Sequence, residues 1–135
     1  MRQLSLFKGK KQRGVKPPPP KEFTLHCLLA DTLTLCCSKH WRWTHLPMGE
    51  HRNIITAMRL KRMGVQRGWP DFIFIGPGKV VFLELKRPRS GRMSEEQILL
   101  MTHLLACGCG YHITNDFNAA VTILATYGIV PIELP

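Results

Sequence analysis

Two short apolar segments separated by a Pro-Gly pair constrain the fold of this chain more than any other feature of its sequence. Residues 71–76 read Asp-Phe-Ile-Phe-Ile-Gly, and residues 80–85 read Val-Val-Phe-Leu-Glu-Leu. Both segments are rich in β-branched and aromatic residues, and Pro77-Gly78 between them favours a tight turn. The sequence therefore predicts a β-hairpin centred on this turn.

Three segments before the hairpin have patterns of their own. After the prolines at 17–20, leucines recur at near-helical intervals over residues 22–37, which indicates a first helix. Residues 40–47 alternate bulky and polar side chains and favour a short strand or an extended loop. Residues 50–63 combine apolar and basic side chains and predict a basic helix, which Gly64 would end.

The segment that follows the hairpin begins with a helix signal. Ser94 and Gln97 have the spacing of a capping box, in which each side chain bonds the backbone N–H of the other residue, and an apolar-periodic run follows them. Residues 111–114 predict another strand, and Asn115 is expected to cap a last helix that runs to about Tyr127. This order of elements predicts an α/β fold with a mixed central β-sheet flanked by helices.

The charge of the chain indicates a polyanionic partner. Its 19 Lys and Arg exceed its 9 Asp and Glu, which gives a formal net charge of +10. Such an excess favours nucleic acid, with an acidic membrane surface as the weaker alternative. Residues 1–20 combine basic side chains with the proline run and are expected to form a flexible tail, while residues 21–135 have the size of one domain.

Several classes of protein are not expected from this composition. No apolar run approaches the roughly 20 residues of a membrane-spanning helix, and the first residues lack the apolar core of a signal peptide. The odd number of cysteines, 5, favours reduced thiols over a disulfide framework, and their spacing does not fit a zinc site. We therefore expect a cytoplasmic protein with no membrane partner and no small-molecule organic cofactor.

Three polar side chains are expected to meet at one end of the hairpin. Asp71 begins the first strand, while Glu84 and Lys86 lie near the end of the second. Because successive side chains of a strand point to opposite faces, Glu84 and Lys86 share one face and the leucines beside them occupy the other. Because the two strands are antiparallel, Asp71 lies opposite Glu84. The hairpin would then present two carboxylates beside an ammonium.

This arrangement suits a hard divalent cation. Mg²⁺ and Mn²⁺ take carboxylate oxygens and keep water molecules for a phosphate substrate. Such an ion would activate water and neutralise charge on a phosphodiester, and Lys86 would orient the nucleophile or stabilise developing negative charge. Without an ion, Asp71 and Glu84 would repel each other. The structural alternative for Glu84 and Lys86 is a solvent-facing ion pair, which is common and weak.

The residues from Gly68 to Gln97 carry a family resemblance. Pro70-Asp71 followed by Glu84-Leu85-Lys86 resembles the PD-(D/E)xK nuclease pattern. A Gly-x-Pro-Asp strand, a Glu-x-Lys followed by a basic Pro/Gly-rich turn, and Ser-x-x-Gln at a helix start are similar to the virus-type replication-repair nuclease domain, VRR-NUC. The resemblance extends over about residues 21–130. It implies a restriction-endonuclease-like core and, more closely, a stand-alone phage-type member.

The resemblance implies a role for each residue of the motif. Asp71, Glu84 and the backbone carbonyl of Leu85 would hold the metal ion. Lys86 would assist the attacking water, and Gln97 would lie against the site. A capping role alone explains Gln97 equally well, so a direct catalytic role is one of two alternatives.

A further metal ligand is expected from outside the hairpin, because such domains usually add a glutamate from the first helix. Glu22 opens that helix and is the better match, and Glu50 is the competitor. The family often has Asn-Glu-Gly where this chain has residues 45–50, so Met48 departs from the pattern.

Basic and histidine side chains outside the motif also have expected roles. Four basic residues flank the predicted site and are expected to contact DNA phosphates: Lys79, Arg87, Arg89 and Arg92. No pair of histidines has the spacing of a recognisable metal-binding motif. We therefore expect structural or DNA-contacting roles for all of them: His26, His40, His45, His51, His103 and His112.

Together these features favour a metal-dependent DNA endonuclease. For stand-alone phage-type members the resemblance implies Mg²⁺ or Mn²⁺ dependence, a homodimer, and action on branched DNA such as four-way Holliday junctions during phage replication, recombination or repair. The setting would be the cytoplasm of a phage-infected or prophage-bearing cell. The alternative is a basic module that holds DNA without cutting it, which predicts salt-sensitive binding that needs no divalent ion.

Overall fold

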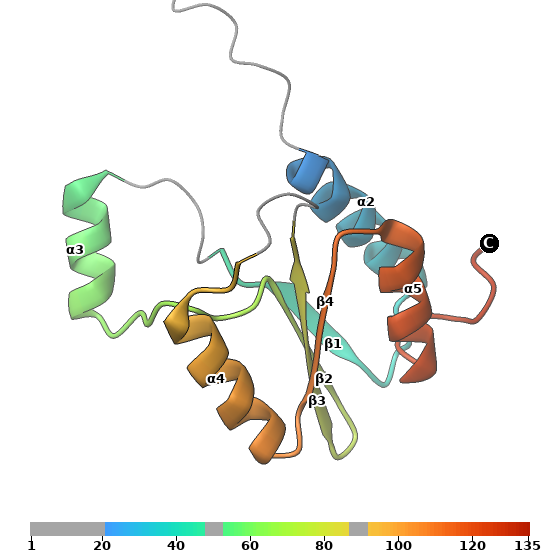
Figure 1. Ribbon diagram of the computed structural model, residues 1–135. Coiled ribbons are helices and arrows are strands. Elements are labelled where there is room, and N and C mark those ends of the chain that lie inside the picture. The colour runs from blue at the N-terminus through green and yellow to red at the C-terminus, as the bar shows by residue number, and fades with distance from the viewer. Residues whose placement is uncertain (1–20, 48–52, 87–91) are drawn as a thin grey trace, which may run out of the picture.

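A four-stranded mixed sheet forms the centre of the protein (Figure 1). The computed structural model describes residues 21–47, 53–86 and 92–135. Along the sheet the strands are ordered β1 (Arg42–His45), β2 (Phe72–Gly76), β3 (Lys79–Leu85) and β4 (Gly110–Thr114). Strands β1, β2 and β3 are antiparallel neighbours, and β4 runs parallel to β3. The predicted hairpin and the predicted mixed sheet are both confirmed.

Helices cover both faces of this sheet. Helices α2 (Lys21–Cys36) and α5 (Phe117–Thr126) lie side by side on one face, and α4 (Glu95–Ala106) lies on the other (Figure 1). Helix α4 also links β3 to β4, because two parallel strands need a crossover connection. Helix α3 (Ile54–Arg62) stands apart from the sheet, and none of its residues is buried. The order of helices and strands is the one that the sequence predicts.

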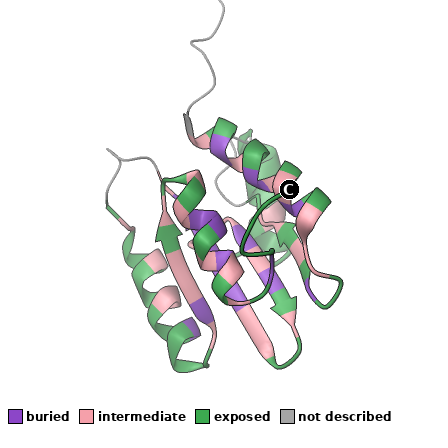
Figure 2. Cartoon of the chain, turned by 90° about the vertical axis from the view of Figure 1, so that its right-hand side faces the viewer, coloured by how far each residue is buried: buried purple, intermediate pink, exposed green. Residues whose placement is uncertain are grey.

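Strand β3 is buried on both of its faces. Val81, Leu83 and Leu85 lie in the main core, together with leucines of α2 and α5. The alternate residues Phe82 and Glu84 point to the opposite face and are buried as well. Figure 2 shows buried residues along the strands and on the inward faces of the helices. A carboxylate is therefore part of the protein interior, where it costs free energy unless a partner compensates it.

Capping residues determine where the helices after the hairpin begin. Ser94 accepts a hydrogen bond from the backbone N–H of Gln97, and the Gln97 side chain accepts one from the Ser94 N–H, so the predicted capping box is present. The prediction for α5 is wrong by one residue, because Asp116 rather than Asn115 accepts from the Ala119 N–H, at 2.9 Å. Asn and Asp are equally good caps, so the choice depends on where the chain leaves β4.

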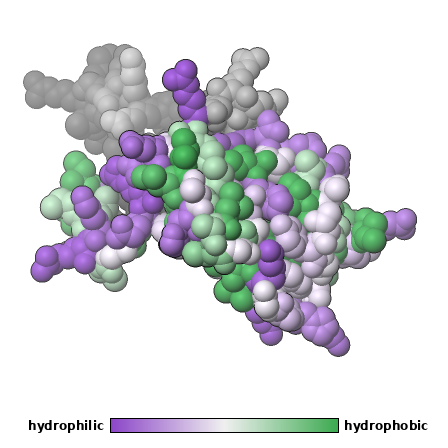
Figure 3. Space-filling model, turned by 60° about the horizontal axis from the view of Figure 1, so that its bottom comes forward, coloured by the Kyte–Doolittle hydropathy of each residue, from purple (hydrophilic) through white to green (hydrophobic). Residues whose placement is uncertain are grey.

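Large apolar side chains are exposed on α2, α3 and α4. They include Ile54, Ile55 and Met58 on α3, and Ile98 and Leu99 on α4. Figure 3 shows hydrophobic and hydrophilic side chains interspersed over the face that it presents. On that face the exposed apolar groups are therefore mixed with polar ones.

Three further expectations concern the class of protein and its organisation. The five cysteines are free thiols. Among the described residues, no helix has both the length and the apolar character needed to span a membrane. The predicted tail at residues 1–20 lies outside the described residues.

The loop before β2 lies directly against the start of α4 at Gly68. Gly68 has a φ of +91°, a conformation that residues with a Cβ rarely adopt. A Cβ at this position would lie 3.0 Å from the backbone carbonyl carbon of Glu96 and 3.1 Å from the backbone nitrogen of Gln97. The next residue, Trp69, packs its ring against that of Phe82 on β3, at a centroid distance of 5.9 Å. The loop therefore fixes the first turn of α4 beside β3.

We predict that Gly68→Ala destabilises the protein more than Gly64→Ala does. Gly64 also has a positive φ, +102°, but a Cβ there would meet nothing within 4 Å. Both changes strain the backbone by about 1 kcal/mol, and Gly68→Ala adds overpacking against α4 that costs roughly 1–2 kcal/mol more. Chemical denaturation of both variants measures the difference in free energy of unfolding. Equal losses would show that the contact between the loop and α4 contributes nothing.

Candidate active site

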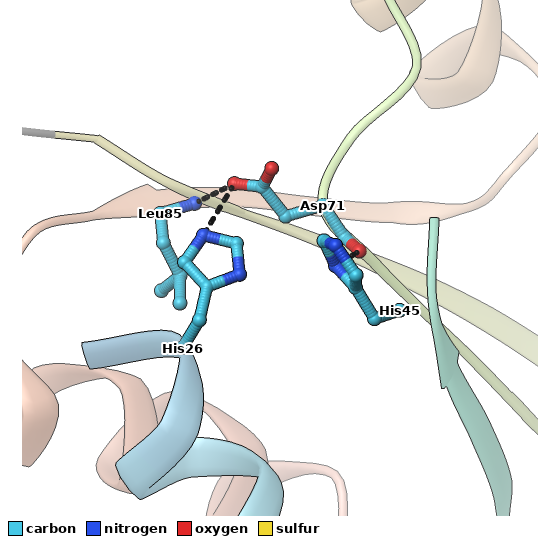
Figure 4. A network of polar contacts seen from close by, with 4 residues as sticks. All are labelled: His26, His45, Asp71 and Leu85. Atoms are coloured by element: carbon cyan, nitrogen blue, oxygen red, sulfur yellow. Dashed lines mark hydrogen bonds and ion pairs between the residues drawn. The ribbon is translucent and has the colours of Figure 1, made fainter. Parts of the chain in front are cut away.

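Asp71 is held through both its backbone and its side chain. Its carbonyl accepts a hydrogen bond from the Leu46 N–H at 2.6 Å and lies 2.7 Å from Nδ1 of His45. Because a carbonyl oxygen only accepts, Nδ1 of His45 carries the proton in this contact. The side-chain oxygen Oδ2 of Asp71 accepts from the Leu85 N–H at 2.7 Å (Figure 4). Asp71 is therefore fixed to the end of β3.

Glu84 lies beside Asp71 and is almost completely buried, with 6% of its surface exposed. Burial first, and then the charge of Asp71 and a hydrogen bond with it, raises the pKa of Glu84 to about 8, against a weaker opposing influence of Lys86. Oxygen Oε2 of Glu84 is buried and has no hydrogen-bond partner. A cation beside these two carboxylates would relieve both their repulsion and the unmet bonding capacity of Glu84.

Lys86 is joined to the start of α4. Its Nζ donates a hydrogen bond to Oε1 of Gln97 at 3.2 Å, and the same oxygen accepts from the Ser94 N–H at 2.9 Å. A single oxygen thus completes the capping box and positions the ammonium. The structure places Gln97 against Lys86, while the direct catalytic role of Gln97 stays a prediction.

A second group of possible ligands comes from the first two turns of α2. Glu22, His26 and Asp71 each offer one metal-ligating atom, and these atoms lie within 4.8 Å of one another. Nitrogen Nε2 of His26 is 3.6 Å from Oδ2 of Asp71 (Figure 4). Because residues four apart share one face of a helix, Glu22 and His26 both reach Asp71. Glu22 thus lies beside the site, and its competitor Glu50 lies outside the described residues.

Two histidines, His26 and His45, lie at this site, and the expected structural or DNA-contacting roles stay a prediction. The ring of His26 lies edge to face with that of His45, at a centroid distance of 5.1 Å, and 5.5 Å from the ring of Phe72. Burial lowers the pKa of His26, although the charge of Asp71 opposes this effect. The spacing of four residues between Glu22 and His26 is a signal in the sequence for such a pairing. The sequence does not show, however, that this helix face turns toward the hairpin.

The predicted DNA-binding residues do not all lie near these carboxylates. Lys79 is at the opposite end of β3, roughly 16 Å along the strand from the acidic residues. Its Nζ donates to the Gly108 carbonyl at 3.0 Å. The expectation that Lys79 flanks the site is therefore wrong, because the length of the strand separates them. Arg92 is exposed just before α4, and Arg87 and Arg89 lie outside the described residues.

Tyr111 on β4 adds a second buried polar atom to this region. Its hydroxyl has no hydrogen-bond partner. Burial, followed by the charges of Glu84 and Asp71, raises the pKa of Tyr111 to about 12, so the phenol stays neutral. The unpartnered oxygens of Glu84 and Tyr111 are both buried in this part of the sheet. A bound ion or ligand could supply the partners that they lack.

The donor chemistry of the site fits a divalent cation. Asp71, just before β2, joins two groups of possible ligands: Glu22 and His26 of α2, and Glu84 near the end of β3. Hard divalent ions take such oxygen ligands in flexible numbers. The unpartnered oxygen of Glu84 is the observation that this interpretation explains best.

The fold is shared with a protein of known structure. No protein-family model matches the chain, and no curated protein matches its sequence. A solved structure described as a VRR_NUC domain protein superposes on it with a TM-score of 0.62, over 82% of this chain and 90% of that chain, at 17% sequence identity. At this level of identity the match establishes the fold. The restriction-endonuclease-like α/β core implied by the sequence motifs is thereby confirmed.

We predict that Glu84→Gln stabilises the metal-free protein. Because the pKa of Glu84 is about 8, folding near pH 7 requires this carboxyl group to take up a proton. The amide avoids that cost and can still donate to Asp71, so the free energy of unfolding in EDTA near pH 7 should rise by about 1–3 kcal/mol. If Mn²⁺ binds here, one site should stabilise the unaltered protein by about 2.7 kcal/mol at a hundredfold excess over the Kd, and the same change should abolish that gain.

Chemical denaturation with and without Mn²⁺ measures both effects of this substitution. Glu133→Gln is the matched control, since Glu133 is exposed near the end of the chain and its change should alter neither value. A Glu84→Gln protein that is less stable in EDTA would contradict the view that this carboxylate is a cost to the fold.

Proposed function

We propose that this protein is a divalent-metal-dependent nuclease of the VRR-NUC type that hydrolyses phosphodiester bonds in DNA. The observation that carries the proposal is the buried carboxylate of Glu84, which lies against Asp71 with one oxygen unpartnered. A purely structural hairpin has no need to bury one carboxyl group against a second one. The fold shared with a VRR_NUC domain protein supports the same conclusion.

The proposed metal ligands are Glu22, Asp71, Glu84 and the backbone carbonyl of Leu85. When bound, Mg²⁺ or Mn²⁺ lowers the pKa of a coordinated water and neutralises charge on the scissile phosphate. The hydrogen bond from the Leu85 N–H fixes the Asp71 carboxylate in advance. This ligand therefore needs little rearrangement during the reaction, which is the benefit of a preorganised site.

Lys86 supplies positive charge from the protein itself. Its ammonium orients the attacking water and stabilises the negative charge that develops on the phosphate. The 3.2 Å hydrogen bond to Gln97 restricts where this ammonium lies. Since the capping box holds Gln97 in turn, the start of α4 positions Lys86 before substrate binds.

DNA is the substrate that the charge of the chain favours. The formal net charge of +10 supports binding to a polyanion. Arg92 is exposed just before α4, where it is available to backbone phosphates. The resemblance of the motifs at residues 68–97 to phage-type VRR-NUC domains further supports a homodimer that acts on branched structures such as four-way junctions.

We predict that Asp71→Asn reduces DNA cleavage by at least about a hundredfold while leaving DNA binding intact. The amide oxygen can still accept from Leu85, so the fold is retained, but the charge that holds the metal is lost. Cleavage of labelled four-way junctions and linear duplexes in Mn²⁺ measures the loss, and a mobility shift in EDTA measures binding.

The same two assays distinguish a nuclease from a protein that only binds DNA. Glu133→Gln serves as the control, because it removes an exposed carboxylate and should cut like the unaltered protein. Salt-sensitive binding without any Mn²⁺- or Mg²⁺-dependent cleavage would instead identify a basic module that holds DNA. Cleavage by Asp71→Asn at the unaltered rate would refute the site.

A further inference from the structure

The imidazole of His26 is held firmly at the edge of the carboxylate site. It lies on α2, which Leu25 and Leu29 anchor in the main core. Its ring packs against the ring of Phe72 at 5.5 Å and meets the ring of His45 edge to face at 5.1 Å. The direction in which Nε2 points is therefore set by packing, and it points to Asp71 (Figure 4).

The distances around His26 suit a shared cation better than a hydrogen bond. Nitrogen Nε2 lies 3.6 Å from Oδ2 of Asp71, which is longer than a hydrogen bond. Two donors bound to one ion at about 2.1 Å each are separated by at most about 4.2 Å. The ligand atoms of Glu22, His26 and Asp71 lie within 4.8 Å of one another, so small movements bring them around a common ion.

We propose that His26 is a direct ligand in this site, so that one nitrogen joins the oxygen donors and the site selects a first-row transition ion over Mg²⁺. This inference rests on the metal site of the proposed function and specifies its preferred ion. Mg²⁺ demands oxygen ligands and gives up its water reluctantly, whereas divalent transition ions accept imidazole nitrogen. Mn²⁺ also takes carboxylates as Mg²⁺ does, which makes it the appropriate probe.

The first test compares affinities for the two ions. Titration of the full chain with Mn²⁺ or Mg²⁺ alone, followed by thermal shift, gives a Kd for each ion without any need for nuclease activity. We expect the unaltered protein to prefer Mn²⁺, and His26→Asp, which makes the site all-oxygen, to reduce that preference at least about tenfold. His103→Asn is the matched control, because His103 is exposed on α4 and lies away from these carboxylates.

The second test detects the nitrogen ligand directly and needs no substitution. Pulsed electron paramagnetic resonance of bound Mn²⁺ reports modulation from a coordinated ¹⁴N nucleus. We expect this modulation in the unaltered protein, its replacement by a ¹⁵N signal after labelling with ¹⁵N-histidine, and its loss in His26→Asp. The measurement on the unaltered chain keeps the proposal testable even where a variant fails to fold.

The outcomes distinguish this inference from the proposed function. If Mn²⁺ binds without nitrogen modulation, and His26→Asp leaves the ratio of the two affinities unchanged, His26 is not a ligand and the inference is overturned while the metal site stands. If nitrogen modulation persists in His26→Asp, a different histidine is the ligand, which also overturns the inference. If neither ion stabilises the unaltered protein, the metal site itself is refuted and both proposals fail.

Discussion

The hydrogen bond between the Leu85 N–H and the Asp71 carboxylate is the contact on which the arrangement of the site depends. It joins the residue before β2 to the last residue of β3, across the open end of the hairpin. Through this bond the Asp71 carboxylate is held against β3, where Glu84 immediately precedes Leu85. The other end of Asp71 is fixed by Leu46 and His45, which bond its carbonyl. A short hairpin thereby holds one carboxylate firmly enough for the neighbouring one to be placed against it.

The burial of Glu84 shows how stability and function oppose each other in this fold. Strand β3 must be apolar because helices cover both faces of the sheet, and a carboxylate within it has few partners of its own. Lys86 offsets part of the cost, since its charge lowers the pKa that burial and Asp71 raise. The remaining imbalance is of the kind that a bound cation removes. A fold selected for stability alone would place an apolar residue here.

The hairpin, the order of elements and the convergence of Asp71 with Glu84 were predictable from sequence, because turn residues and the two-residue period of strands set the register locally. The capping box of Ser94 was predictable for the same reason. The location of His26 could not be predicted from sequence. Which face of α2 turns toward the hairpin depends on how the leucines of this helix pack in the core. Lys79 was expected to flank the site because it is close to the motif in sequence. It lies at the other end of β3 from Glu84, and an extended strand separates residues in space more than a helix or turn does.

The role of Gln97 shows why structural and catalytic explanations need not exclude each other. Its Oε1 accepts from the Ser94 N–H and from the Lys86 ammonium, so the group that starts α4 is also the group that holds the charged side chain. Gly68 allows the loop before Asp71 to press against that same helical turn. The positions of the ammonium and of the aspartate are therefore coupled through the first turn of α4. A substitution that loosens this turn should therefore displace the Lys86 ammonium and Asp71 together, even where the substituted residue contacts neither Asp71 nor Glu84.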